Sequence, residues 1–441
     1  MTATANLTAP SLEQLAPHVT PRVKQGDLAT AQMALIGIGL ALIGAAWGLG
    51  GERFHFSYLV GYMGVLGICL CALFFTMVQH ITRAGWSVVV RRLAENVAGT
   101  LPFMLLLFIP NVIGFDHLYH HWTHAVIDPA QPGYDAVIAG KSSYLNSTSF
   151  FVRVGIYFAI WIGLALTFRG SSLKQDNSGD PAISLKLARL AAPGLLLFAL
   201  SVTFAAFDWI MSLDPHWFST IFGLTYFAGG YMAFLAFTIL LAKWLGTKGY
   251  LKDAITVEHY HDLGKLLFAF MVFWTYTNFS QYMLIWYANL PEETRWFADR
   301  RENGWGAVGT ILLFGHFFIP FVYLMSRHVK RNGVALSVGA IFLLFIHCID
   351  MQFLILPTAA QHGGDHGGEA THGAAAHAGH DHGGFSAQLG EYLHNANWMD
   401  FGCFVGVLAI VAGLTLWNVR RTNLVPMRDP RLAESLHFTN I

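Results

Sequence analysis

"ARLAAPGLLLFALSVTFAAFDWIMSLDPHW", residues 188–217, is the stretch of sequence that decides the fold. Its apolar run is long enough to cross a bilayer as a helix, which takes about 20 residues. Asp208 interrupts this run before it ends, and Asp214 and Pro215 follow at its outer end. An ionisable side chain inside a membrane span is costly, so it usually faces protein or water and marks a functional site. The stretch therefore predicts a membrane helix that carries a buried polar site.

The rest of the 441-residue chain repeats the apolar pattern, with 54% hydrophobic and only 12% charged residues. Soluble domains usually contain about 25% charged residues. Ten runs have the length of a membrane span: 30–49, 58–80, 97–115, 149–169, 188–213, 219–242, 264–288, 305–326, 335–356 and 398–419. These runs predict an all-α polytopic membrane protein with ten transmembrane helices. The formal net charge of zero gives no basic surface for a nucleic acid partner.

The distribution of basic residues predicts the orientation in the membrane. Of the 26 lysines and arginines, about twenty fall on the side of the ten-span topology that holds both termini, and about five fall on the other side. Basic loops stay cytoplasmic, so both termini are expected in the cytoplasm. The expected domains are a cytoplasmic tail at 1–29, a membrane domain at 30–420 and a cytoplasmic tail at 421–441. The loop at 357–397 is then periplasmic.

Spans 5 and 9 predict an internal repeat. Asp208 is followed seven residues later by Pro215, and Asp350 is followed seven residues later by Pro357. Both spans run outward, and the proline is expected to end each helix. We therefore expect two four-helix bundles, formed by spans 2–5 and spans 6–9, with spans 1 and 10 as flanking helices. Such repeats often place a site near the interior of the membrane.

Several further polar residues lie inside the predicted spans. His347 and Asp350 are three residues apart and share a helical face, so the imidazole and the carboxylate are expected to share a proton. Asn278 and Gln281 have the same spacing, and His316 lies near the middle of span 8. The candidate proton pathway, expected to converge in the outer half, consists of Asp208, His316, His347, Asp350, Asn278, Gln281, Asp116 and Asn111. Its cytoplasmic-side candidates are His80 and Lys265. The alternative is that each residue makes a local hydrogen bond between helices.

No metal or redox site is expected in this chain. The four cysteines lie within predicted spans without metal-site spacing, and no C-x-x-C-H haem attachment motif occurs. His316 and His347 are the only deep histidines that a haem b could use as ligands. The outer loop holds six histidines without fixed spacing, His362, His366, His372, His377, His380 and His382. Histidine-rich tracts bind metals weakly, so these six are secondary metal candidates.

Two segments resemble a known family. "FDWIMSLDPHWFSTIFGLTYFAGG" (207–230) and "FSQYMLIWYANLPEET" (279–294) are similar to the F subunit of bacterial alternative complex III, a quinol:cytochrome c oxidoreductase. The resemblance also covers the ten spans and the cytoplasmic termini, but not the histidine-rich loop or the N-terminal tail. It implies the polysulfide-reductase type of integral membrane subunit, built from two four-helix bundles with flanking helices, in the bacterial cytoplasmic membrane.

The resemblance further implies a non-catalytic subunit with structural and proton-conducting roles. In that complex, quinol (menaquinol in many bacteria) is oxidised at a paralogous C subunit. Electrons then pass through iron–sulfur clusters and haem c groups on partner subunits to cytochrome c or a terminal oxidase. Two alternatives stay open at this stage. One is a quinone-binding subunit, and the other is a secondary transporter or metal permease, suggested by the repeat and the histidine-rich loop.

Overall fold

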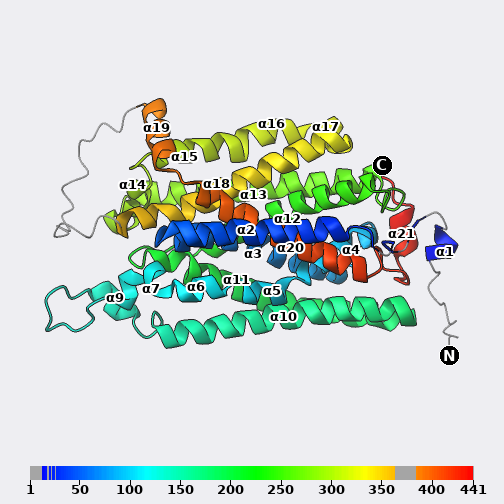
Figure 1. Ribbon diagram of the computed structural model, residues 1–441, viewed down its shortest axis with the longest axis horizontal. Helices are drawn as coiled ribbons and strands as arrows, with labels where there is room; N and C mark the ends of the chain where they lie inside the picture. Colours follow the sequence, from blue (N-terminus) through cyan, green and yellow to red (C-terminus); the bar gives the residue numbers. More distant parts are fainter. Residues whose placement is uncertain (1–11, 17–18, 21, 25, 363–383, 441) are drawn as a thin grey trace.

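The computed structural model describes residues 12–16, 19–20, 22–24, 26–362 and 384–440, and within these residues it contains helices and no strands. Most helices lie roughly parallel along one long axis, and the first and last described helices, α1 (Leu12–Leu15) and α21 (Leu432–Leu436), lie at the same end of the molecule (Figure 1). This end is called the terminal end below, and the opposite end is called the distal end. The prediction of an all-α polytopic membrane protein is confirmed.

The first part of the chain forms ten helices, of which α2, α3 and α10 are long and the others are short. Their bounds are α1 Leu12–Leu15, α2 Ala29–Gly50, α3 Arg53–Ile81, α4 Val88–Ala98, α5 Leu101–Leu106, α6 Ile109–Ile113, α7 Phe115–Leu118, α8 His120–Thr123, α9 Ala136–Lys141 and α10 Ser147–Ser178.

The second part continues with long helices and a π-helical segment. Its elements are α11 Pro181–Trp209, the 3-10 turn η1 Met211–Leu213, α12 Phe222–Thr247, α13 Val257–Ala288, α14 Pro291–Asp299, α15 Trp305–Leu312, the π-helix η2 Leu313–Phe318, α16 Ile319–Met325, α17 Arg327–Arg331, α18 Gly333–His362, α19 Phe385–Asn395, α20 Trp398–Arg421 and α21 Leu432–Leu436.

Nine helical segments in the described residues are long and apolar enough to cross a membrane, and they match nine of the ten predicted spans. The remaining span, 264–288, lies inside the 32-residue helix α13. This helix is long enough to cross, but Lys265, Asn278, Gln281 and its many Tyr and Trp residues lower its mean hydropathy. The count of ten therefore stays a prediction.

The core runs along α3 and α12, which are the most deeply buried membrane helices. α3 contacts α4, α10 and α11 of the first predicted set, and α12 contacts α13 and α18 of the second, but α3 also packs on α12 and α18, so the division into two bundles stays a prediction. The two sets meet where α3 packs against α12 and α18. Gly67 and Gly230 form this crossing, because a side chain on Gly230 would lie 3.1 Å from the Gly67 Cα. α2 and α20 pack on each other and on α3 at the flank.

The third span differs from the prediction in its start and its continuity. The helical segment begins at Val88 rather than at residue 97, so Arg91, Arg92 and Glu95 lie inside the protein and not in a loop. Pro102 and Pro110 each stand in the first turn of a new short helix, because proline lacks the amide that would continue the preceding one.

The prediction that Pro357 ends a helix is wrong. α18 continues through Pro357 to His362, whereas α11 ends at Trp209, directly after Asp208. Proline leaves the carbonyl four residues earlier without its helical partner, and Arg300 compensates: its Nε donates to the Phe353 carbonyl at 3.0 Å. The two Asp–Pro pairs are therefore alike in sequence but not in their place relative to the helix end.

Candidate functional site

Four helical elements of the second set enclose a cluster of polar side chains, here called the His–Asp cluster. It consists of Trp274 from α13, His316 from η2, and His347 and Asp350 from α18. The side chains of both histidines and of Asp350 are almost fully buried, with exposures of 0%, 0% and 3%. Gly229 of α12 leaves room for them, since a side chain there would lie 3.5 Å from both Asp350 Oδ2 and His347 Nδ1.

His316 stands on a π-helical segment that interrupts its span. π-bulges inside α-helices occur frequently at functional sites, because one extra residue re-aims the side chains that follow. The His316 ring stacks on the Trp274 ring, with centroids 3.5 Å apart and planes 18° from parallel. Neither ring nitrogen of His316 has a hydrogen-bond partner in the described structure. Buried polar atoms normally have partners, so the two nitrogens mark a place for water, a proton or a ligand.

Asp350 has one hydrogen bond, accepted by its Oδ2 from Trp274 Nε1 at 3.1 Å. No ion pair joins Asp350 to a lysine or arginine among the described residues. A buried carboxylate without a cation is unusual, because charges inside proteins are normally paired. Asp350 is therefore the ionisable group in the described membrane helices that most needs a functional explanation.

His347 and Asp350 do not form the direct hydrogen bond expected from their spacing. His347 Nε2 lies 3.3 Å from the Gly64 carbonyl of α3. A carbonyl only accepts, so Nε2 carries the hydrogen and Nδ1 of the neutral ring is an acceptor. This Nδ1 has no partner. Because no direct hydrogen bond joins His347 to Asp350 in the described structure, any proton that they share needs an intervening group such as water.

Asp208 lies in a different environment, within the first set. Arg153 of α10 donates to both carboxylate oxygens, at 2.7 Å and 3.0 Å, and the Tyr157 hydroxyl donates at 2.6 Å. The Arg153 guanidinium also lies over the Tyr144 ring, 3.8 Å from its centroid. This arrangement matches the alternative in which a carboxylate ties two helices together. The structure provides no contact that brings Asp208 into the His–Asp cluster.

The other candidates of the outer half do not converge on the cluster either. Asn278 donates to the carbonyl of Trp274 in its own helix, and Gln281 accepts from Ser219 at 2.9 Å. Asn111 is buried with both side-chain polar atoms unpartnered, whereas Asp116 is exposed. The expected convergence of all eight residues is thus wrong. Asp208, Asn111 and Asp116 belong to the first set, and Asn278 and Gln281, although they share α13 with Trp274, bond to a backbone carbonyl and to Ser219.

The two cytoplasmic-side candidates lie at the terminal end. His80, in the last turn of α3, is buried with Nε2 unpartnered, and it lines a cavity of about 230 Å³. Lys265 is exposed and forms an ion pair with Asp262 at 2.6 Å. Lys265 is therefore a surface residue, whereas His80 faces a polar interior.

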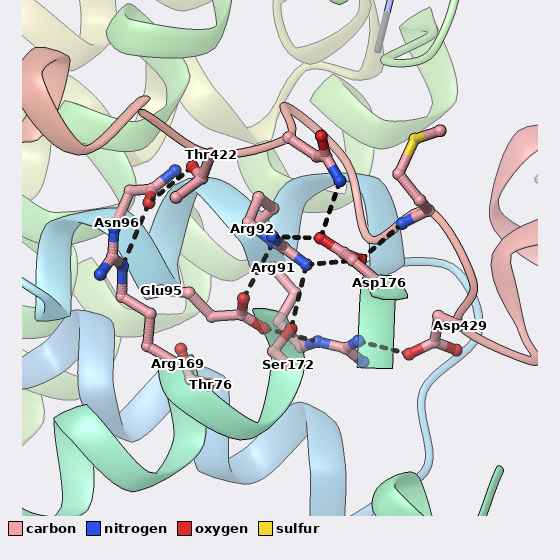
Figure 2. Close-up of polar contacts among 12 residues, drawn as sticks. Thr76, Arg91, Arg92, Glu95, Asn96, Arg169, Ser172, Asp176, Thr422 and Asp429 are labelled. Carbon is pink, nitrogen blue, oxygen red and sulfur yellow. Dashed lines mark hydrogen bonds and ion pairs between the residues drawn. The ribbon is translucent and has the colours of Figure 1, made fainter. Parts of the chain in front are cut away.

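A buried ion-pair network that the sequence did not predict lies close to His80, because its Arg91 lines the same cavity (Figure 2). Arg91 pairs with Asp429 at 2.5 Å and with Glu95 at 3.2 Å, while Arg92 pairs with Glu95 at 3.0 Å and with Asp176 at 2.8 Å. One feature of the sequence could have indicated the network. The charged run "RRLAEN" at 91–96 leads into the predicted span at 97–115 with no turn residue between them, which favours one continuous helix.

The C-terminal tail is part of this network. Asp429 belongs to the tail, and Asp176 accepts hydrogen bonds from the Met427 amide at 2.8 Å and from Asn423 at 3.1 Å. Arg169 adds a third guanidinium, which contacts Asn418 at 3.1 Å. Three arginines and three carboxylates balance here, so the network is a structural tie that closes the terminal end of the first set.

No group of three or more His, Cys, Asp or Glu residues in the described part of the chain is arranged to hold a metal ion. His366, His372, His377, His380 and His382 lie outside the described residues, and His362 is the last residue of α18. The four cysteines are buried and free. A search of protein-family models and of curated proteins finds no match to this chain.

Proposed function

We propose that this chain is an integral membrane subunit of a quinol:cytochrome c oxidoreductase of the alternative complex III type, and that its His–Asp cluster exchanges protons within the membrane. The observation that carries the proton role is Asp350, buried without a cation beside two imidazoles that have unpartnered nitrogens. Intramembrane ionisable residues of this kind mark proton relays and ion pathways. The assignment to the complex is supported by the two quoted segments, 207–230 and 279–294.

In this proposal the chain holds no redox centre and is not itself catalytic. The paralogous C subunit oxidises the quinol, and the iron–sulfur clusters and haem c groups belong to partner subunits. The subunit lies in the bacterial cytoplasmic membrane with the terminal end in the cytoplasm, as the basic residues suggest. Its contribution is to support the complex and to provide groups that take up and release protons.

The chemistry of the cluster suits proton exchange. Imidazole is the side chain whose charge changes most readily near neutral pH. His347 offers an acceptor at Nδ1, and Asp350 offers its Oδ2, because both atoms lie 3.5 Å from the position that a side chain on Gly229 would take. A water molecule in that space would bridge them with two hydrogen bonds. The stacked Trp274 holds both Asp350, through its Nε1, and His316, through its ring.

The test is proton stoichiometry in vesicles that contain the purified complex. Asp350→Asn keeps the shape and removes the exchangeable proton, so protons moved per electron should fall while quinol oxidation is largely retained. Asp116→Asn, the same change at an exposed carboxylate, is the matched control. Unchanged stoichiometry in Asp350→Asn would refute the proton role. Failure of the chain to purify with haem c and iron–sulfur subunits would refute the assignment and favour a transporter.

A quinone-binding role is the second candidate, and the unpartnered nitrogens of His316 favour it. A quinone headgroup needs an apolar site with one or two hydrogen-bond donors, and the π-helix supplies such a donor beside an aromatic ring. A photoreactive quinone should then crosslink to this chain near His316, and His316→Phe should abolish the crosslink. Crosslinking only to a partner subunit would exclude this role.

A further inference from the structure

A cavity of about 230 Å³ opens at the terminal end, between the end of α3, α4, the start of α11 and the C-terminal tail. We call it the His80 cavity. The side chains that matter for its chemistry are His80, Arg83, Arg91, Leu185, Asp429 and Arg431. A water molecule occupies about 30 Å³ in the liquid, so the space is large enough for a group of several heavy atoms.

The lining of the His80 cavity carries excess positive charge. Arg91 is neutralised, because it pairs with Asp429 and Glu95. Arg83 and Arg431 form no ion pair with any carboxylate in the described part of the chain. Two uncompensated guanidinium groups therefore face one cavity. Guanidinium groups prefer planar, bidentate binding of carboxylates and phosphates.

His80 provides a second, independent sign of a ligand. Its side chain is only 4% exposed, yet its Nε2 has no partner in the described structure. Leaving a buried donor or acceptor unpaired costs free energy, and an oxyanion in the cavity would offer acceptors to it. Unlike Arg83 and Arg431, His80 stands on a membrane helix, in the last turn of α3.

The depth and the apolar rim of the cavity fit a lipid. Leu185, in the second turn of α11, is 46% exposed beside the cavity, and the uninterrupted apolar run of this helix starts only at Leu190. The exposed Lys186 and Arg189 lie on the same part of α11, between Leu185 and the start of the apolar run. This is where phosphate groups of a bilayer lie, and basic pockets between membrane helices bind anionic headgroups.

We propose that the His80 cavity binds a phosphate oxyanion through Arg83, Arg431 and His80, with the phosphate of an anionic phospholipid or a free phosphate as the two sources. This site is independent of the His–Asp cluster and of the proposed membership in a respiratory complex. Leu185 favours the lipid, because it offers an apolar surface to the first part of an acyl chain.

The experiment measures lipid retention on the full-length chain, together with any subunits that accompany it. Native mass spectrometry would count phosphatidylglycerol and phosphatidylcholine that remain bound after titration in detergent. Arg83→Gln with Arg431→Gln should weaken phosphatidylglycerol binding on the order of 30-fold, since each basic residue near a membrane surface contributes about 1 kcal/mol. Both side chains are at least partly exposed, so the double variant is expected to fold.

Arg428→Gln is the matched control, because Arg428 belongs to the same tail but binds the Asn177 carbonyl at 2.9 Å, outside the cavity. The proposal is overturned if the double variant and the control lose phosphatidylglycerol equally, or if phosphatidylcholine binds wild type equally well and inorganic phosphate has no effect.

A second arm adds inorganic phosphate without lipid. Thermal stabilisation of wild type by phosphate, absent in the double variant, would identify a free anion as the source.

Discussion

At the scale of single residues, two similar aspartates have opposite surroundings. Asp208 is held by Arg153 and Tyr157, whereas the one hydrogen-bond partner of Asp350 among the described residues is the Trp274 ring nitrogen. Charges buried in proteins are normally paired, so the carboxylate without a cation is the one that needs a further explanation. The two aspartates share a sequence motif, but Asp208 is a structural residue and Asp350 is a candidate functional one.

Arg153→Met tests the structural role of Asp208. Removing one partner of a buried pair leaves an uncompensated charge, and the Arg153 side chain is only 16% exposed. We expect the free energy of unfolding in detergent to fall by about 3 kcal/mol, at the lower end for buried pairs. Adding Asp208→Asn should recover much of this loss, which a double-mutant cycle measures. Additive effects of the two changes would contradict the tie.

His316→Phe tests the functional role of the His–Asp cluster. Phenylalanine keeps the ring that stacks on Trp274 and removes two unpartnered nitrogens. The free energy of unfolding should stay unchanged or rise by up to about 1 kcal/mol, because no hydrogen bond is lost. Proton release per electron should fall. A clear loss of stability would indicate that His316 is a structural residue with a bound partner.

At the scale of elements, close helix crossings depend on single glycines. The crossing of α3 and α12 is so tight that a side chain on Gly230 would lie 3.1 Å from the Gly67 backbone. Small residues allow such approaches in membrane proteins, where packing rather than water exclusion drives association. Gly44 and Gly48 of α2, which have the small-residue spacing typical of close helix contacts, face open space instead. α2 meets α20 through Gly39, whose added side chain would contact the Gly406 carbonyl.

Gly230→Leu should separate α3 from α12 and so loosen the seam between the two helical sets. Overpacking usually costs about 1–3 kcal/mol, and the backbone neighbour here cannot move aside as a side chain would. Gly246→Leu, near the end of the same helix, is the control because nothing lies within 4 Å of an added side chain there. Equal thermal stability of the two variants would contradict this account of the crossing.

The pairing of α13 with α17 gives a pH dependence. The hydrogen bonds from Arg331 to Glu258 lower the pKa of that carboxyl to about 2, from 4.5. A folded-state pKa below the unfolded one means that the stabilisation is complete above pH 4.5 and is lost as the pH falls toward 2. Glu258→Gln should therefore lower the melting temperature slightly at pH 7, and the difference should vanish near pH 2. Glu292→Gln, at an exposed glutamate, should show no such trend.

At the scale of the whole molecule, the C-terminal tail closes the terminal end. Asp429 reaches the buried Arg91, and the Met427 amide binds Asp176 of α10. The tail that follows α20 is thereby joined to the first helical set, with 338 residues of sequence separation between Arg91 and Asp429.

Asp429→Asn should weaken this closure. Arg91 keeps Glu95 as a partner, so the loss should be about 2 kcal/mol, the value of a hydrogen bond between charged groups. Unfolding in detergent measures the loss, and limited proteolysis should cut the tail faster than in wild type. Asp253→Asn, at an exposed aspartate of another loop, is the control. Equal cleavage of the two variants would contradict a docked tail.

By itself, the sequence determined the fold class and nine of the spans, because the length of an apolar run is a local property that the bilayer thickness fixes. It also found the three ionisable members of the His–Asp cluster, since charged or polar residues within apolar runs stand out. It did not find Trp274 as a member, nor the π-helix, nor the buried Arg91–Asp429 pair. Only the tertiary structure decided these, and it also separated Asp208 from Asp350, because partner choice depends on which helices pack together across long stretches of sequence.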